Sequence, residues 1–245
     1  MKVVIVLKIN KEKCIGCENC IDYCPMNAIS PDNGTVAIDL DNCVECSVCL
    51  RSKCCPVDAI YREELVYPRD IAHFFSDPFA THPSTKIPGR GTEEMKTNEV
   101  TNRFPPGIAG IAIELGRPGI GTRFEDVEKV IKALKEFNLT FERENPVTAL
   151  ILPDGTFPDD LRNTKVMSAI VEFGVELELV PAILNKLAKV EDDLQTVFSL
   201  DLAVRCDDSG VPILNGIDKK IPYNLSVNGK TNIGIGRSNI NRGGQ

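Results

Sequence analysis

Nine of the ten cysteines of this chain fall between residues 14 and 55, in two runs of nearly the same spacing. The first run, residues 14–25, has the pattern C-x2-C-x2-C-x3-C-P, and the second, residues 43–56, repeats it with two additional residues before its last cysteine. The residues that follow also repeat, since Cys-Pro-x-x-Ala-Ile occurs at 24–29 and at 55–60. A short unit is therefore duplicated, and its cysteines constrain this region more than any other feature.

Cysteines spaced three residues apart in groups of three are typical of iron–sulfur sites. Their thiolates lie on one tight loop and bind three corners of a cubane, so the fourth ligand must come from elsewhere in the chain. Structural zinc uses pairs of C-x2-C knuckles, which these triplets match poorly. A disulfide framework needs an oxidising compartment, and the apolar N-terminus, residues 3–7, is typical of a strand rather than a signal peptide. We therefore favour iron–sulfur ligation over both alternatives.

Residues 1–65 resemble the bacterial-type ferredoxins that hold two [4Fe–4S] clusters. In that family the cysteine before proline binds the cluster of the other repeat. The resemblance implies that one cluster is bound by Cys14, Cys17, Cys20 and Cys55, and the other by Cys43, Cys46, Cys49 and Cys24. The paired Cys54 and Cys55 depart from the family pattern. We assign Cys55 as the ligand because it precedes Pro56, which leaves Cys54 as a spare thiol or a substitute ligand.

The charge of the chain excludes some classes of partner. Its 28 Lys and Arg against 35 Asp and Glu give a formal net charge of −7 in 245 residues. This charge repels phosphate backbones and anionic lipid, so we expect no binding to nucleic acid or to a membrane. No apolar run reaches the roughly 18 residues of a membrane-spanning helix, and we expect a cytoplasmic protein. Because bound clusters add further negative charge, we also expect a low reduction potential.

Residues 66–107 have a different composition, with six prolines and several glycines. This composition argues against regular elements, and a loop of such length is usually functional or an interdomain linker. The segment contains both histidines, His73 and His82, and the polar stretch 89–98. We expect either a surface linker or a docking loop here.

From residue 108 onward, strand and helix patterns alternate. The apolar spacing predicts strands at 108–115, 147–152, 166–173 and 197–204, and helices at 122–137 and 180–194. A capping-box pattern at Thr122 to Glu125 opens the first helix and Asn138 ends it, while Pro181 lies in the first turn of the second. The order β-α-β-β-α-β predicts a split βαβ domain over 108–245, with two helices on one face of an open sheet.

The fold class expected for the whole chain is α+β. Strands at 3–9 and 35–40 bracket the cysteine loops, and Asp32-Asn33-Gly34 between them is a turn signal. The expected divisions are a two-cluster domain over 1–65, a linker or docking loop over 66–107, and an α/β domain with a Gly/Arg-rich tail over 108–245.

One glycine-rich loop of the C-terminal region is a candidate anion site. Gly116, Arg117, Gly119 and Gly121 lie between a predicted strand and a helix N-terminus, whose N–H groups and positive end favour anions. The spacing is not that of a dinucleotide-binding fingerprint. A site with Arg117 and Arg123 as charge partners and a plain tight turn both stay open. We expect Cys206 to be a free thiol, and the tail from 229 to 244 to be flexible or a partner-binding strand.

Residues 80–240 resemble the ferredoxin-containing part of 6-hydroxynicotinate reductase, an iron–sulfur flavoenzyme of anaerobes. The resemblance rests on residues 89–98, on the loop 116–121 and on Lys-Thr-Asn-Ile-Gly-Ile-Gly-Arg at 230–237. It implies ferredoxin-linked reduction of an organic substrate, with flavin nearby. Because that family's enzyme is a longer chain, it also implies that a flavin sits on a larger partner subunit.

The leading hypothesis is therefore an electron-transfer subunit of an anaerobic redox complex, rather than a stand-alone enzyme, since the chain has no acid–base or nucleophile motif. One alternative is a ferredoxin-linked reductase whose C-terminal domain binds a flavin or an organic substrate. A second alternative is an iron–sulfur assembly or regulatory protein. The sequence leaves open the electron donor, the acceptor and the oligomeric state.

Overall fold

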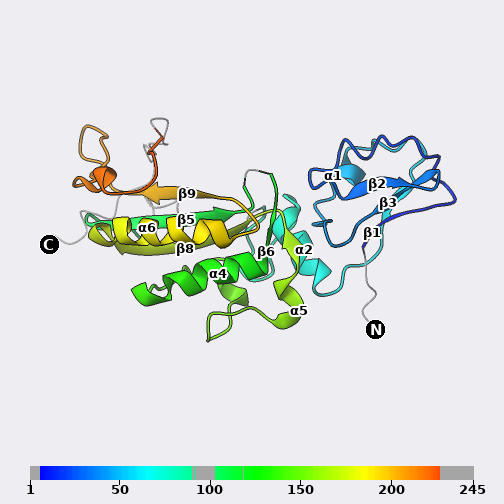
Figure 1. Cartoon of the computed structure of the whole chain (residues 1–245). Helices are drawn as coiled ribbons and strands as arrows, with labels where there is room; N and C mark the ends of the chain where they lie inside the picture. Colours follow the sequence, from blue (N-terminus) through cyan, green and yellow to red (C-terminus); the bar gives the residue numbers. More distant parts are fainter. Residues whose placement is uncertain (1–5, 90, 92–102, 118, 227–245) are drawn as a thin grey trace.

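The computed structural model describes residues 6–89, 91, 103–117 and 119–226. The N-terminal part lies at one end of the molecule and the C-terminal part at the other, with helix α2 where they meet (Figure 1). Among the described residues, no helix is both long enough and apolar enough to cross a membrane.

The N-terminal part consists of two small antiparallel strand pairs and one short helix. Strand β1 (Leu7–Ile9) pairs with β4 (Ile60–Arg62), β2 (Ile29–Asp32) pairs with β3 (Thr35–Ile38), and α1 (Val48–Arg51) follows the second cysteine loop. Asn33 and Gly34 join β2 to β3 with φ values of 46° and 78°, as a two-residue hairpin turn requires. The strands near 3–9 and 35–40 and the turn are thus confirmed, although residues 1–5 lie outside the described residues.

A helix occupies the segment that we expected to lack regular structure. Helix α2 (Arg69–Ser76) begins after Pro68 and ends before Asp77 and Pro78. The prediction was wrong here because these two prolines flank the helix, where their missing N–H groups break no helical hydrogen bond. Most of the polar stretch 89–98 lies outside the described residues.

The C-terminal part is built on one antiparallel sheet of three strands in the order β8-β5-β9. Helices α4 and α6 pack against each other and run alongside this sheet (Figure 1). The bounds of these elements are β5 (Ile108–Leu115), α4 (Phe124–Leu134), β8 (Ala169–Glu176), α6 (Val180–Val190) and β9 (Phe198–Ala203). A short pair, β6 (Thr122–Arg123) with β7 (Lys165–Val166), and helix α5 (Asp159–Arg162) complete it, with short 3-10 helices between.

The four-stranded sheet that we expected is wrong in one strand, because residues 147–152 form a 3-10 helix at Thr148–Leu150. The fully buried Asn145 explains the difference. Its side chain accepts a hydrogen bond from Val147 N at 2.8 Å and donates to Ile170 O at 3.0 Å and to Glu172 Oε2 at 2.8 Å. The side chain of Asn145, rather than the backbone of a strand, therefore bonds to β8 here. The residues before it form an isolated bridge to β8, between Phe141 and Phe173.

The expected helices are present with shifted ends. The predicted capping box is wrong, because Thr122 lies in β6 and pairs with Val166 of β7. The N-cap residue of α4 is Arg123, whose side chain makes no capping hydrogen bond. Asn138 does end this helical stretch, with φ 49°. Helix α6 begins with proline in its first turn, as expected, and continues into a 3-10 helix at Glu191–Asp193. The strand expected at 166–173 is present as β8, which begins and ends three residues further along the chain.

Helix α2 joins the two parts through buried charge. Arg69 forms an ion pair with the fully buried carboxylate of Glu45, and also donates to the backbone oxygens of Leu40 and Cys43. At the other end of the helix, Asp77 accepts from Arg51 at 2.6 Å. The helix therefore fixes the second cysteine loop, 43–49, against the C-terminal part.

Replacing Arg69 by alanine is expected to destabilise the protein by about 3–5 kcal/mol, because the buried Glu45 carboxylate loses its countercharge. The matched control is Lys8→Ala, which breaks the exposed Lys8–Glu63 pair and is expected to change little. Thermal unfolding midpoints of the two variants check this prediction, and equal midpoints contradict it.

His82 is a second buried ionisable group, and its burial makes the stability of the protein depend on pH. Burial beside the Phe75 ring, 4.8 Å between centroids, lowers its pKa to about 4 from 6.5. The unfolded chain therefore binds more protons than the folded chain between these values. Stability from this group is complete above about pH 6.5 and decreases by about 3 kcal/mol as the pH falls to about 4.

The prediction for NMR is that the His82 ring signals, identified by their loss in His82→Gln, do not shift between about pH 8 and about pH 5.5. A titration midpoint near the unperturbed histidine value contradicts this expectation.

Candidate metal centre

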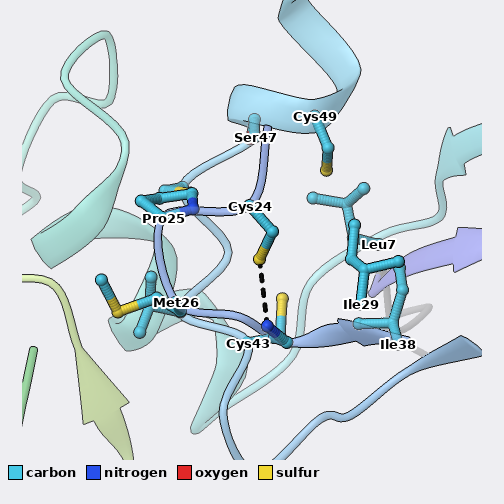
Figure 2. A pocket seen from close by; sticks show the side chains of 12 residues that line it. Leu7, Cys24, Pro25, Met26, Ile29, Ile38, Cys43, Ser47 and Cys49 are labelled. Carbon is cyan, nitrogen blue, oxygen red and sulfur yellow. Dashed lines mark hydrogen bonds between the residues drawn. The ribbon is translucent and has the colours of Figure 1, made fainter. Parts of the chain in front are cut away.

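Four cysteines line a pocket between the two repeats, here named the Cys43 pocket (Figure 2). The sulfurs of Cys24, Cys43 and Cys49 point toward its middle, with Leu7 and Ile29 on the facing wall (Figure 2). The space measures about 330 Å³, including open solvent at its mouth. Its lining residues are Leu7, Cys24, Pro25, Met26, Ala28, Ile29, Ile38, Cys43, Val44, Cys46, Ser47 and Cys49.

A second pocket of about 300 Å³, again including open solvent, is here named the Cys14 pocket. It too is walled by four cysteines and by apolar side chains. Its lining residues are Ile9, Cys14, Ile15, Cys17, Glu18, Cys20, Val36, Cys55, Val57, Ala59 and Ile60.

Each pocket receives one cysteine from the other repeat. Cys24 of the first repeat joins the Cys43 pocket, and Cys55 of the second repeat joins the Cys14 pocket. All eight cysteines expected as ligands are thus brought together in the two expected groups of four. Cys54 lines neither pocket, and its thiol donates to Cys49 O at 3.4 Å.

The cysteine that each repeat contributes to the other pocket accepts an equivalent hydrogen bond from a backbone N–H group. Ala28 N donates to Cys24 Sγ at 3.2 Å, and Ala59 N donates to Cys55 Sγ at 3.2 Å. Donors to sulfur stabilise the negative charge of a thiolate and tune the potential of a bound cluster. The sequence analysis missed these donors, although the repeated Cys-Pro-x-x-Ala was their signal.

The backbone of the two cysteine loops repeats as well. Left-handed residues stand at equivalent places: φ is 64° at Gly16 and 57° at Glu45, then 61° at Glu18 and 60° at Ser47. Left-handed residues among right-handed ones form concave turns lined by N–H groups, which favour negative charge. Only the first loop needs a glycine, because a Cβ at Gly16 would lie 2.4 Å from Gly34 O.

Three of the cysteines in the pockets, Cys20, Cys43 and Cys49, hold their protons more tightly than an ordinary thiol. Burial raises the pKa of Cys20 to about 11, that of Cys43 to about 11 and that of Cys49 to about 12. All ten cysteines are free thiols. A positively charged group must therefore displace these protons, as a metal centre does.

The donor set fits an iron–sulfur cubane. Each pocket offers four soft sulfur ligands, apolar walls and an N–H donor to sulfur. Within the described residues, no three His, Cys, Asp or Glu side chains converge on one point, as the ligands of a single ion would. In a cubane, each thiolate instead binds a different iron atom.

The sequence analysis also missed the polar residues around the Cys43 pocket. His73 Nδ1 lies 3.2 Å from Glu45 O, and Arg51 donates to Cys46 O at 2.8 Å. Asp77 accepts from Arg51, and the pKa of its carboxyl is lowered by backbone and side-chain hydrogen bonds and by this guanidinium, against the effect of burial. No signal in the sequence linked His73 of α2, or Asp77 just after it, to the cysteine loop.

The two ends of the loop 116–121, Gly116 and Gly121, are closely packed, and residue 118 lies outside the described residues. Gly121 N donates to Gly116 O at 3.1 Å, and a Cβ at either glycine would lie under 3 Å from the backbone oxygen of Met167 or Val166. Packing thus accounts for Gly116 and Gly121, while Gly119 has open space beside it and Arg117 is exposed. Arg123 donates to backbone oxygens, among them Asp41 O at 3.3 Å. Anion binding here stays a prediction.

Two further expectations concern the end of the chain. Cys206 is a free thiol, as expected, and it is exposed. The glycine- and arginine-rich tail, 229–244, lies outside the described residues, as does most of 89–98. These segments carry much of the resemblance to 6-hydroxynicotinate reductase, which therefore stays a prediction.

Comparison with known proteins identifies the N-terminal part. A family model described as a 4Fe-4S binding domain matches residues 7–30. A ferredoxin of Alicyclobacillus acidocaldarius is 41% identical over 63 residues, which are 25% of this chain and 77% of that protein.

The pyruvate synthase subunit PorD of Methanocaldococcus jannaschii is 48% identical over 59 residues, and PorD of Methanothermobacter marburgensis is 42% identical over 55. The matched residues are 23% and 22% of this chain, and they span 66% and 62% of those two proteins. Through its N-terminal part, the chain belongs to the family of ferredoxins with 4Fe-4S clusters.

Proposed function

We propose that this chain binds two [4Fe–4S] clusters and serves as the electron-transfer subunit of a larger oxidoreductase. The observation that carries the proposal is the pair of four-cysteine pockets, one of which holds Cys24 and the other Cys55. When bound, such clusters take up and release single electrons. The proposed domain division is that of the sequence analysis, with the clusters in residues 1–65.

The residues around each pocket have distinct roles in this proposal. The eight cysteines hold the clusters, and each repeat contributes a ligand to the other. Buried apolar residues, among them Leu7, Ile29 and Val36, exclude water from the sulfurs. The N–H groups of Ala28 and Ala59 orient toward sulfur and stabilise its charge.

The remaining details follow from charge and from the relatives. Residues 1–65 hold more acidic than basic side chains, and four thiolates per cluster add negative charge, so we propose a low potential. Two relatives are by name subunits of pyruvate synthase. We accordingly propose a larger redox partner for this chain, in the cytoplasm of an anaerobe, with any flavin on that partner.

Purification without air, followed by iron and sulfide analysis, tests the proposal. About eight iron and about eight sulfide per chain are expected, with the visible and EPR spectra of [4Fe–4S] clusters. A colourless or zinc-loaded protein overturns the proposal. A flavin bound by this chain alone favours the reductase alternative instead.

The neighbouring Cys54 and Cys55 provide a matched pair for the ligand assignment. Cys54→Ala is expected to keep about eight iron, because Cys54 lines neither pocket. Cys55→Ala removes one ligand from the Cys14 pocket, where Cys54 could serve as the substitute ligand. The variant that lacks both Cys54 and Cys55 is expected to keep about four iron, those of the cluster in the Cys43 pocket. Loss of iron in Cys54→Ala together with full retention in Cys55→Ala would reverse the assignment.

A further inference from the structure

The two pockets differ sharply in exposure, although their sequences repeat. Ile15 is 62% exposed, whereas Val44 at the equivalent place in the second repeat is 1% exposed. Cys17 is exposed, whereas its counterpart Cys46 is buried. The duplication alone predicts equal exposure, so something outside the repeats causes the difference.

The cover of the Cys43 pocket comes from α2 and from the C-terminal part. Met167 packs against a small core formed by Met26, Ala28, Val44 and Cys46, and a Cβ at Gly121 would lie 3.2 Å from Met26 Sδ. Arg69 of α2 binds the buried Glu45 at the same loop.

Hydrogen bonds hold this cover in place. Lys165 Nζ donates to Asn42 Oδ1 at 3.1 Å, and the backbone Met167 N donates to Ser76 Oγ of α2 at 2.9 Å. The bonds join the C-terminal part to the residue before the second cysteine loop and to α2. A partner protein therefore has no direct approach to the loop 43–49 on this side.

The Cys14 pocket has no comparable cover among the described residues. Its exposed rim consists of Ile15, Cys17 and Glu18, with Asp58 exposed next to the lining residue Val57. The rim thus combines the exposed apolar side chain of Ile15 with the carboxylate of Glu18, and Lys13, next to Cys14, is the exposed basic residue beside it. The chain as a whole carries a charge of −7. This surface, the Cys14 rim, favours a partner that places positive charge around an apolar contact.

We propose that the Cys14 rim is the docking surface for the redox partner, and that the partner is a basic one-electron redox protein. The inference rests on the proposed function. A cluster held by Cys14, Cys17, Cys20 and Cys55 would give one electron to the redox group of the partner, with no bond made or broken. Because electron tunnelling weakens steeply with distance, a cluster in the exposed Cys14 pocket would exchange electrons with the partner directly, and one in the covered Cys43 pocket would do so through the first.

The test uses cytochrome c, a small basic redox protein, as the probe. Iron, sulfide and EPR spectra first establish that the full chain and each variant hold their clusters. Calorimetric titration of the two oxidised proteins at low ionic strength then measures binding without electron transfer. Stopped-flow mixing of the reduced chain with oxidised cytochrome c measures the transfer rate separately.

The variants compare the Cys14 rim with the loop 206–212 at the other end of the molecule (Figure 1). Glu18→Lys is expected to weaken binding about fivefold, since it reverses one charge at the contact, and Ile15→Ala about threefold. The matched controls are Asp208→Lys and Val211→Ala, because Asp208 is exposed and Val211 is 57% exposed. Each control is expected to change binding less than about twofold.

The outcomes separate the two proposals. Absence of clusters refutes the proposed function before any binding is measured. Clusters present, with rim and control variants equally affected, overturn the docking surface and leave the proposed function standing. Failure of the wild-type chain to bind cytochrome c at low ionic strength also overturns the docking surface.

Discussion

The exchange of one cysteine between the repeats is the constraint on which the N-terminal part depends. Neither loop alone encloses a pocket of four sulfurs, because the fourth sulfur of each comes from the other repeat. The repeats must therefore fold against each other to complete either pocket. The two strand pairs bring Cys24 and Cys55 across, and the Cys-Pro-x-x-Ala turn aims an N–H group at each of these sulfurs.

A second interaction breaks this symmetry. Where the first loop has Gly16, the second has Glu45, a fully buried carboxylate paired with Arg69 of α2. A buried charge is tolerated only with a partner of opposite charge, so this residue ties the second loop to the helix that leads into the C-terminal part. The chain thereby covers one of two nearly equivalent pockets and leaves the other at the surface. In the arrangement that we propose, the residues after the repeats control which of the two pockets faces a partner.

Where the sequence misled us, a side chain or a boundary effect was responsible. The apolar run at 147–152 has the pattern of a strand, but the amide of Asn145 bonds to the backbone and carboxylate of β8 in place of a neighbouring strand. Prolines around α2 suggested a loop, yet they stand at its ends. The glycines of 116–121 suggested anion binding, yet two of them are required by the close approach of the backbone at Val166 and Met167.

The sequence by itself determined the cysteine sets, the hairpin turn at Asn33-Gly34 and the two longer helices of the C-terminal part, α4 and α6, because these depend on spacing and on local backbone preference. The tertiary structure alone decided which pocket is covered, which polar residues surround it and how many strands form the sheet. Those outcomes depend on contacts between residues far apart in the chain, such as Arg69 with Glu45 and Lys165 with Asn42, and no local pattern encodes them.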